Sequence, residues 1–357
     1  MHKFIDVNKI LVIKLRHIGD VLLSVPVFRA LRENFPKAHI AALVNSGTEE
    51  TLTGNPLINE VIVFDRNIKG ENIIGRVKRE SAFLLMLRKK HFDMTIDLTS
   101  GDRAAVISLA SQARYRIAYD PLGQGFVGKR YIYTHIGEKN EKQHMVLQNL
   151  DLIKQFGIST DNLVVDFHIP DEAKSFARSI FETNSIKSDD KVVHIHPTSR
   201  WLFKCWKDEY MAEIIGWLIE EGINVIVTSS PDEKEKEKAK RILSLAPLSS
   251  RLIDLCGKTS IKQLGAISGA SDLFFGIDTA PMHIAAAVGT PVIALFGPTD
   301  EARWRPWGSE GHITVKETLR CMPCKKGVCD GIAFLECMDS IKPEKVKKVI
   351  SRALNNA

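Results

Sequence analysis

Short apolar runs rich in β-branched residues alternate with amphipathic stretches along nearly the whole chain. In its first half the pattern predicts strands near 9–15 (KILVIKL), 38–44, 60–64, 93–98 and 115–119. The second half repeats the pattern, with strands near 191–196 (KVVHIH), 223–228, 251–255, 272–277 and 291–296. Helical spacing fills the intervals, which is typical of parallel sheets covered by helices on both faces. The sequence therefore predicts an α/β protein with two Rossmann-like lobes.

The length of the chain also favours two domains, because 357 residues exceed the roughly 100 to 200 residues of a typical single domain. The polar stretch around 169–190 has no long apolar pattern, and we interpret it as the region between the lobes. We place the first lobe at 1–175 and the second at 176–340. Apolar residues at helical spacing predict a C-terminal helix within 341–357.

The net charge of +6 is concentrated in the first half of the chain. Residues 1–170 hold 23 Lys or Arg against 18 Asp or Glu, whereas the remainder holds 26 against 25. A basic first half suits an anionic partner such as a phosphorylated glycolipid or a membrane surface; ordinary solvated charge is the alternative. We exclude nucleic acid as a partner because no Lys/Arg block carries interleaved aromatics.

The first residues lack the pattern of a secretory signal, and charged residues or glycine interrupt every apolar run before the roughly 18 residues of a membrane span. We therefore expect a cytoplasmic protein whose contact with a membrane is peripheral.

Ligands of open α/β sheets bind beyond the carboxyl ends of the strands, so the loops after the predicted strands are the candidates for chemistry. The first loop, RHIGD, follows the first strand. Gly19 permits a tight turn, and Asp20 falls at a helix start, where the backbone favours an ionised carboxylate that can accept a proton. The alternative is that Asp20 is only an N-cap. The loop is neither a G-x-G-x-x-G dinucleotide fingerprint nor a P-loop.

The second loop, HPTSRWLFKCW, begins at His196 and brings hydroxyls and two cations together. Arg200 can bind phosphate oxygens bidentately while Lys204 supplies a compact charge, so the pair suits a diphosphate without a metal. The alternative is surface cations among packing aromatics.

The third stretch, GIDTAPMHIAAAVG, predicts a strand end, a turn and a short helix that stops at Gly289. Thr279 is in the N-cap position, and an open helix N-terminus there would bind phosphate. Asp278 can accept hydrogen bonds from sugar hydroxyls. His283 is either a packed core residue or part of the lining of the site.

Together these stretches resemble the ADP-heptose:lipopolysaccharide heptosyltransferases, glycosyltransferase family 9, across essentially the whole chain. ILVIKLRHIGDVLLSVPVFRALRENFP resembles the family's first βα unit, and FFGIDTAPMHIAAAVGTPVIALFGPTD resembles its donor-site segment. HPTSRWLFKCW and WRPWG most resemble the heptosyltransferase III branch, which adds a branching heptose to the inner core.

The resemblance implies a GT-B fold, with the two lobes facing across a cleft, the acceptor bound by the first lobe and ADP-heptose by the second. It also implies that the helix within 341–357 packs back across the lobes, as terminal helices do in GT-B proteins. It implies inversion at the anomeric carbon and no cofactor or metal for catalysis. It further implies a lipopolysaccharide inner-core glycolipid as acceptor, at the inner leaflet of the inner membrane.

Carried over residue by residue, the resemblance makes Asp20 the catalytic base and Lys204 the contact to the donor phosphates. Ala280 stands where family members often have glycine, which places a methyl group near the phosphates. The donor-binding positions implied are Thr198, Ser199, Arg200, Glu233, Thr259, Asp278, Thr279, Ala280 and His283. The acceptor-binding positions are Arg16, His17, Gly19 and Arg103.

Four of the six cysteines are closely spaced in the C-terminal part, as Cys321-x2-Cys324-x4-Cys329-x7-Cys337. Four thiolates at such spacing suit a structural zinc ion, which in a cytosolic chain outranks disulfides. Reduced packing cysteines are the alternative.

Two other functions are compatible with the same fold. A nucleotide-sugar epimerase would use the same diphosphate loop but would need no acceptor. A non-catalytic two-lobed sugar-binding protein would have no need of a carboxylate at Asp20 and would normally carry an export signal.

Overall fold

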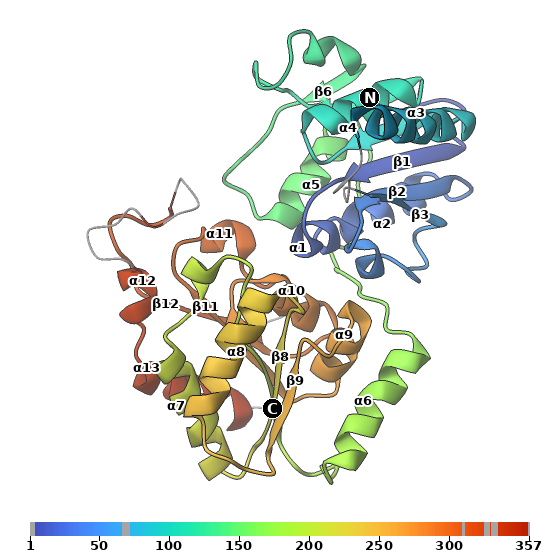
Figure 1. The fold of residues 1–357 in the computed structure, drawn as a ribbon. Helices are drawn as coiled ribbons and strands as arrows, with labels where there is room; N and C mark the ends of the chain where they lie inside the picture. The colour runs from blue at the N-terminus through green and yellow to red at the C-terminus, as the bar shows by residue number, and fades with distance from the viewer. Residues whose placement is uncertain (1–3, 66–71, 309–310, 325–328, 330–334, 356–357) are drawn as a thin grey trace. The chain divides into compact units, whose positions relative to one another are not determined.

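The computed structural model describes residues 4–65, 72–308, 311–324, 329 and 335–355. The chain divides into two compact units, Met1–His168 and Ile169–Ala357, drawn blue to green and green to red in Figure 1. The predicted boundary at 175/176 falls inside a helix of the second unit. No helix among the described residues is long and apolar enough to cross a membrane.

The first unit is a parallel six-stranded sheet in the order β3-β2-β1-β4-β5-β6, with helices on its faces. Its strands are β1 (Lys9–Lys14), β2 (His39–Asn45), β3 (Glu60–Phe64), β4 (Met94–Asp97), β5 (Tyr115–Tyr119) and β6 (His135–Gly137). Its α-helices are α1 (Ile18–Leu22), α2 (Val25–Asn34), α3 (Ile73–Lys89), α4 (Asp102–Ala110) and α5 (Met145–Lys154). Two 3-10 turns, η1 (Glu49–Thr51) and η2 (Lys129–Ile132), complete it.

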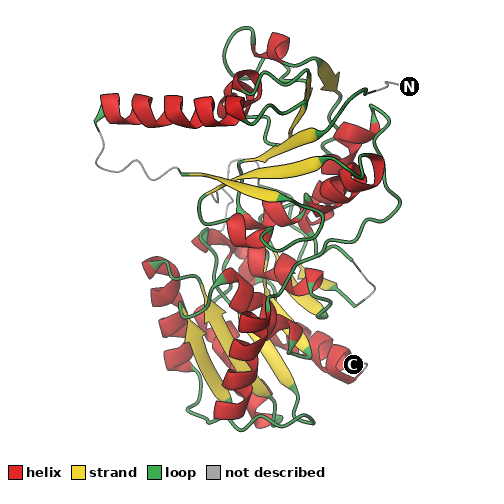
Figure 2. Ribbon diagram, turned by 90° about the vertical axis from the view of Figure 1, so that its right-hand side faces the viewer, coloured by secondary structure: helices red, strands yellow, loops and turns green. Residues whose placement is uncertain are grey.

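The second unit repeats this design, with the sheet order β12-β11-β10-β7-β8-β9 (Figure 2). Its strands are β7 (Val192–His196), β8 (Asn224–Ser229), β9 (Leu252–Cys256), β10 (Leu273–Ile277), β11 (Val292–Phe296) and β12 (Ile313–Lys316). Its helices are α6 (Asp171–Thr183), η3 (Leu202–Lys204), α7 (Asp208–Glu220), α8 (Glu233–Leu245), α9 (Ile261–Gly269), α10 (Ala280–Ala287), α11 (Glu301–Trp304), α12 (Glu336–Asp339) and α13 (Pro343–Asn355).

All ten predicted strands form within one residue of the predicted ends, and the α/β architecture is confirmed. The central strands are buried on both faces, which explains their continuous apolar runs. The prediction missed β6 and β12. Both lie at the outer edge of their sheets and are three or four residues long, too short to give a hydrophobic pattern.

The helix predicted after the first strand is divided into α1 and α2. Pro26 lies in the first turn of α2, where its missing N–H costs nothing, whereas in a continuous helix its ring would clash with the preceding turn. Val21 and Phe28, one on each helix, are both fully buried against the sheet. The break leaves α1 as a single short turn that carries Asp20.

The boundary between the two units falls at 168/169, at the start of the stretch 169–190 that we interpreted as the inter-lobe region, and part of that stretch forms α6 in the second unit. Ala173 and Ala177 are buried one turn apart, and Phe176 and Ile180 pack beside them against the same core. The helix packs on α9. The amphipathic spacing was present but was masked by the polar residues on the exposed face.

The predicted C-terminal helix is α13. Val346 and Ile350 are fully buried in the core of the second unit, where α13 packs on α7. A further contact of this helix with the first unit stays a prediction. Trp206 anchors the same region, because its indole N–H donates to the carbonyls of Met338 (3.1 Å) and Ile341 (3.0 Å).

Candidate functional site

In each unit the chain crosses from one half of the sheet to the other at a single place. In the first unit β1 lies between β2 and β4, and in the second unit β7 lies between β8 and β10. Connections leave in opposite directions from β1 and β4, and likewise from β7 and β10, so the loops diverge at the carboxyl ends of these strands. Such switch points are where open α/β sheets bind ligands. The predicted RHIGD, HPTSRWLFKCW and GIDTAPMH segments follow β1, β7 and β10.

At the switch point of the first unit, the loop after β1 is held by the loop after β4. The guanidinium of Arg16 donates to the carbonyl of Thr99 (2.9 Å), and the backbone N–H of Leu15 donates to the Thr99 hydroxyl (2.8 Å). Asn45, at the end of β2, donates to the carbonyl of Arg16 (3.2 Å). The neighbouring strands thus fix the backbone that precedes Asp20.

Asp20 lies in the first turn of α1 and is half-buried. The N-cap of this helix is His17, so the alternative that Asp20 is only an N-cap is wrong. Gly19 is buried beside it, where the turn enters the core. The carboxylate is therefore held at the carboxyl end of β1 without serving as the helix cap.

Sequence reasoning missed Lys14, the last residue of β1, which is almost completely buried. Its ammonium donates to the carbonyl of Leu98 (3.1 Å) and to the side-chain carbonyl of Asn149 (2.9 Å). Burial lowers the pKa of Lys14 to about 8, while the negative charge of Asp20 opposes this shift. A lysine at the end of an apolar strand is a signal that the sequence did contain.

Sequence reasoning also missed Asp97, a buried carboxyl group at the end of β4, next to the same switch point. Its carboxylate accepts from the Tyr133 hydroxyl (2.6 Å) and from the N–H groups of Thr99 (2.8 Å) and Ser100 (3.0 Å). Burial nevertheless raises the pKa of Asp97. The group stabilises the β4 loop that supports Arg16.

Arg103, predicted to bind acceptor, lies on α4 and faces the neighbouring elements of its own unit. Its guanidinium is 4.9 Å from the centre of the Phe64 ring and 3.5 Å from the carboxylate of Glu80. These contacts place it beside β3 and α3, and its role toward an acceptor stays a prediction.

At the switch point of the second unit, the loops after β7 and β10 are joined by an ion pair. The ammonium of Lys204 is 2.8 Å from the carboxylate of Asp278, with side chains 18% and 7% exposed. The same ammonium lies 3.5 Å from the Asp278 carbonyl. The structure therefore brings together two residues that are 74 positions apart and that were both predicted to contact the donor.

The loop that carries Lys204 is fixed at its start as well. Thr198 is fully buried, and its hydroxyl donates to Glu235 on α8 (2.9 Å); the Ser199 hydroxyl accepts from the N–H of Trp201 (3.2 Å). Trp201 is exposed, which goes against the alternative of packing aromatics at this position, and the Arg200 guanidinium lies 5.9 Å from its ring. The loop thus presents a cation and an aromatic face to solvent from a rigid base.

The acidic residue that meets this loop is Glu235, not Glu233. Glu233 begins α8, exposed, and pairs with Lys236 (2.6 Å) one turn later. Glu235 is buried, and this burial raises the pKa of its carboxyl. The segment DEKEKEK (residues 232–238) contains several carboxylates, and only the structure reveals which of them faces inward. Thr259 directly precedes Ser260, the N-cap of α9, and is half-buried after β9.

The third predicted segment forms the end of β10 and the start of α10. Thr279 has the backbone conformation of an N-cap, but its side chain makes no capping hydrogen bond, and Ala280 begins the helix. The N-terminal N–H groups are therefore not capped by that hydroxyl, which suits an anion. His283 is buried on the same helix. Gly276 permits close packing, since a Cβ there would lie 2.7 Å from the carbonyl oxygen of His196.

The four clustered cysteines show no metal-binding arrangement in the part of the chain that the structure describes, and a structural zinc ion stays a prediction. No group of three or more His, Cys, Asp or Glu side chains there is placed to hold a metal ion. Cys321 is exposed whereas Cys337 is buried, so the thiols lie at different depths. Burial first, and then the three neighbouring cysteines, raise the pKa of Cys337 to about 11, which favours the protonated thiol.

Two units of the same doubly wound topology, with a cation and an uncapped helix N-terminus at the switch point of the second, are the architecture of GT-B proteins, and the family match makes the chain a glycosyltransferase. The family model described as glycosyltransferase family 9 (heptosyltransferase) matches residues 81–331, and the chain belongs to this family.

A curated relative agrees with this assignment, and two solved structures share the fold. The chain is 33% identical over 303 residues to lipopolysaccharide heptosyltransferase 3 of Escherichia coli K12, covering 82% of this chain and 83% of the relative. A family 9 glycosyl transferase from Veillonella parvula DSM 2008 superimposes with a TM-score of 0.84 at 21% identity over 100% of this chain and 99% of that one. The E. coli ADP-heptose LPS heptosyltransferase II superimposes with a TM-score of 0.78 at 20% identity, over 98% and 99%.

The buried Lys14 predicts an alkaline dependence of stability. Its pKa falls from 10.5 to about 8 on folding, so between these values the unfolded chain holds a proton that the folded chain has lost. Wild-type stability therefore rises with pH in this window, by at most about 3 kcal/mol from this group. We expect the difference in free energy of unfolding between wild type and Lys14→Met to move in favour of wild type from pH 8 to 10.5, measured by urea denaturation.

The matched control is Lys9→Met at the exposed start of the same strand. It removes a lysine from the same strand but keeps the buried ammonium, so it should not reproduce the change expected for Lys14→Met. A flat difference for Lys14→Met would show that the ammonium is not desolvated.

Proposed function

We propose that the chain transfers a heptose from ADP-heptose to the inner core of lipopolysaccharide, at a branching position, with inversion and without a catalytic metal. Support comes from its family and from its similarity to a curated lipopolysaccharide heptosyltransferase 3. The observation that carries the proposal is the Lys204–Asp278 pair beside the open N-terminus of α10. This arrangement provides positive charge for a departing nucleoside diphosphate.

In this mechanism Asp20 accepts the proton of the acceptor hydroxyl while the hydroxyl oxygen attacks the anomeric carbon. The bond between that carbon and the diphosphate oxygen breaks, and ADP leaves with the electron pair. A single carboxylate suffices for inversion, because no covalent intermediate needs a second nucleophile. The first unit then has the role of acceptor-binding domain.

The second unit has the role of donor-binding domain. Lys204 has three N–H donors, and its contacts to the carboxylate and carbonyl of Asp278 hold the ammonium in place while leaving donor capacity for phosphate. Arg200 on the same loop and the N–H groups at the start of α10 add charge and hydrogen bonds where negative charge develops. These groups can stabilise the leaving ADP without a metal ion.

We further propose that the acceptor is held at a membrane, with the enzyme associating peripherally on the cytoplasmic side. The first unit carries the excess of positive charge that suits an anionic surface.

Asp20→Asn tests the base. Because general-base assistance contributes roughly 10²- to 10⁴-fold, we expect turnover to fall by that range, while the Kd for ADP-heptose, measured by calorimetry, changes less than about twofold. Glu33→Gln, an exposed acid on α2, is the control and should retain wild-type turnover. Undiminished turnover in Asp20→Asn would remove Asp20 from the mechanism.

Lys204→Ala tests the phosphate contact. Loss of a charge-assisted hydrogen bond of roughly 1.5–3 kcal/mol should weaken ADP binding about 10- to 100-fold and slow transfer as well. The control is Lys207→Ala. Lys207 lies three residues after Lys204, and its exposed ammonium pairs with Asp339. This variant should leave ADP binding and the rate of transfer unchanged.

Lys204→Ala also leaves the buried Asp278 carboxylate without its partner, which destabilises the fold. The double variant Lys204→Ala/Asp278→Asn removes that charge. It should recover stability in thermal unfolding but not ADP affinity. Wild-type ADP affinity in either variant would refute the role of Lys204.

A further inference from the structure

One face of the first unit combines exposed apolar side chains with cations. The helix α3 has 17 residues, of which only Leu87 is buried. Ile73, Ile74, Val77 and Leu85 recur at helical spacing along one side of it and point away from the core. In Figure 2, α3 is the long helix at the upper left, and its first turns extend past the sheet.

The neighbouring helix α4 continues this apolar face. α3 packs against α4, and α4 contributes two further exposed apolar side chains, Val106 and Leu109. We call the six residues the α3–α4 face: Ile73, Ile74, Val77, Leu85, Val106 and Leu109. They are between 41% and 79% exposed, which is unusual for so many large apolar residues on two adjoining helices.

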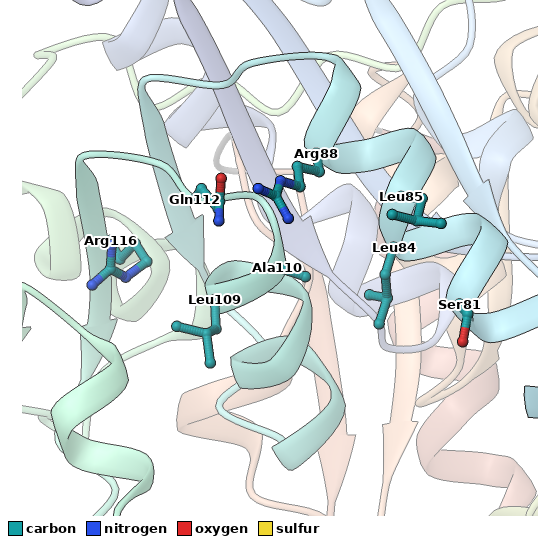
Figure 3. A pocket seen from close by; sticks show the side chains of 8 residues that line it. All are labelled: Ser81, Leu84, Leu85, Arg88, Leu109, Ala110, Gln112 and Arg116. Carbon is teal, nitrogen blue, oxygen red and sulfur yellow. The ribbon is translucent and has the colours of Figure 1, made fainter.

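A pocket of about 640 Å³ opens within this face (Figure 3). Leu84 and Leu85 of α3 and Leu109 of α4 give it apolar walls, while Arg88 and Arg116 bring guanidinium groups to the same hollow. The guanidinium of Arg116 is oriented by the carbonyls of Ile132 (2.6 Å) and Ala113 (2.7 Å). An apolar hollow with cations at its edge matches a molecule that has an acyl part and an anionic part.

The charges of α3 favour an anionic partner. The helix carries five Lys or Arg against one Glu, and that Glu80 is paired with Arg103. Among the described residues, Lys78, Arg88 and Lys89 form no ion pair with a carboxylate. Free cations flanking an apolar stripe are the pattern of a helix that lies in a membrane interface, with its apolar side among the acyl chains and its cations at lipid phosphates.

We propose that the α3–α4 face is the surface by which the first unit docks on an anionic lipid bilayer. This inference rests on the proposed function, because it supplies the means by which the enzyme reaches an acceptor anchored in a membrane. Exposed apolar residues enter the interface, and the cations select negatively charged lipid. Docking involves no residue of the proposed donor site.

Vesicle sedimentation tests the proposal with the full-length chain. Wild type should bind vesicles of phosphatidylglycerol and phosphatidylcholine at least tenfold more tightly than vesicles of phosphatidylcholine alone, and less tightly at high salt because the charges are screened. Val77→Asp/Leu85→Asp should lose at least tenfold of that binding. Arg88→Glu/Lys89→Glu should lose the preference for phosphatidylglycerol.

The matched control is Leu245→Asp/Leu248→Asp, two exposed leucines of the second unit, which should bind vesicles as wild type does. Heptose transfer to a delipidated, soluble acceptor should be equal in wild type and in all three double variants. If that transfer is absent from wild type, the proposed function fails while vesicle binding still reports on the face. Three results would overturn the proposal that the α3–α4 face docks on a membrane. Wild type would not bind anionic vesicles, or the face variants would bind them like wild type, or the control would lose as much binding as the face variants.

Discussion

The ion pair between Lys204 and Asp278 is the interaction on which the candidate site depends. It joins the loops after β7 and β10 at the one place in the second sheet where connections diverge. A buried carboxylate is costly unless a cation accompanies it, and a lysine on an irregular loop has many conformations unless something holds it. The ion pair therefore stabilises the buried carboxylate and restricts the lysine, and it holds the ammonium group beside the uncapped start of α10. A leaving diphosphate needs such a preorganised charge, since reorganising the site during the reaction would raise the barrier.

The first unit uses the same topology for a different purpose. Its switch point holds a half-buried carboxylate, Asp20, above a buried lysine rather than a cationic loop. Lys14 is fixed by Leu98 and Asn149, and Arg16 by Thr99, so that the backbone before Asp20 is supported by two neighbouring elements. In the proposed function, one repeated architecture thus presents an acid–base group in one unit and an anion-binding group in the other. That difference comes from the loops, which agrees with the general finding that sites are built on folds rather than determined by them.

Much of this arrangement was predictable from local sequence, and the failures have physical causes. Buried parallel strands give uninterrupted apolar runs, so their ends were predicted closely, whereas the short edge strands β6 and β12 bury too little to leave a pattern. Asp20, Lys204 and Asp278 were singled out because they follow such strands, and their roles stay predictions. Glu235 was missed, because only tertiary packing decides which carboxylate at the start of this acidic helix faces Thr198. The cysteine spacing alone could not decide between zinc binding and packing, since spacing does not fix the depth at which Cys321 and Cys337 lie.

The most direct test of the account is mass spectrometry of a truncated lipopolysaccharide acceptor that lacks the branching heptose, after incubation with the protein and ADP-heptose in a chelating buffer. The account predicts that the acceptor gains the mass of one heptose and that ADP is released in equal amount. It would be contradicted by an acceptor of unchanged mass, by ADP-heptose converted in the absence of acceptor, or by transfer that occurs only when a divalent metal is restored.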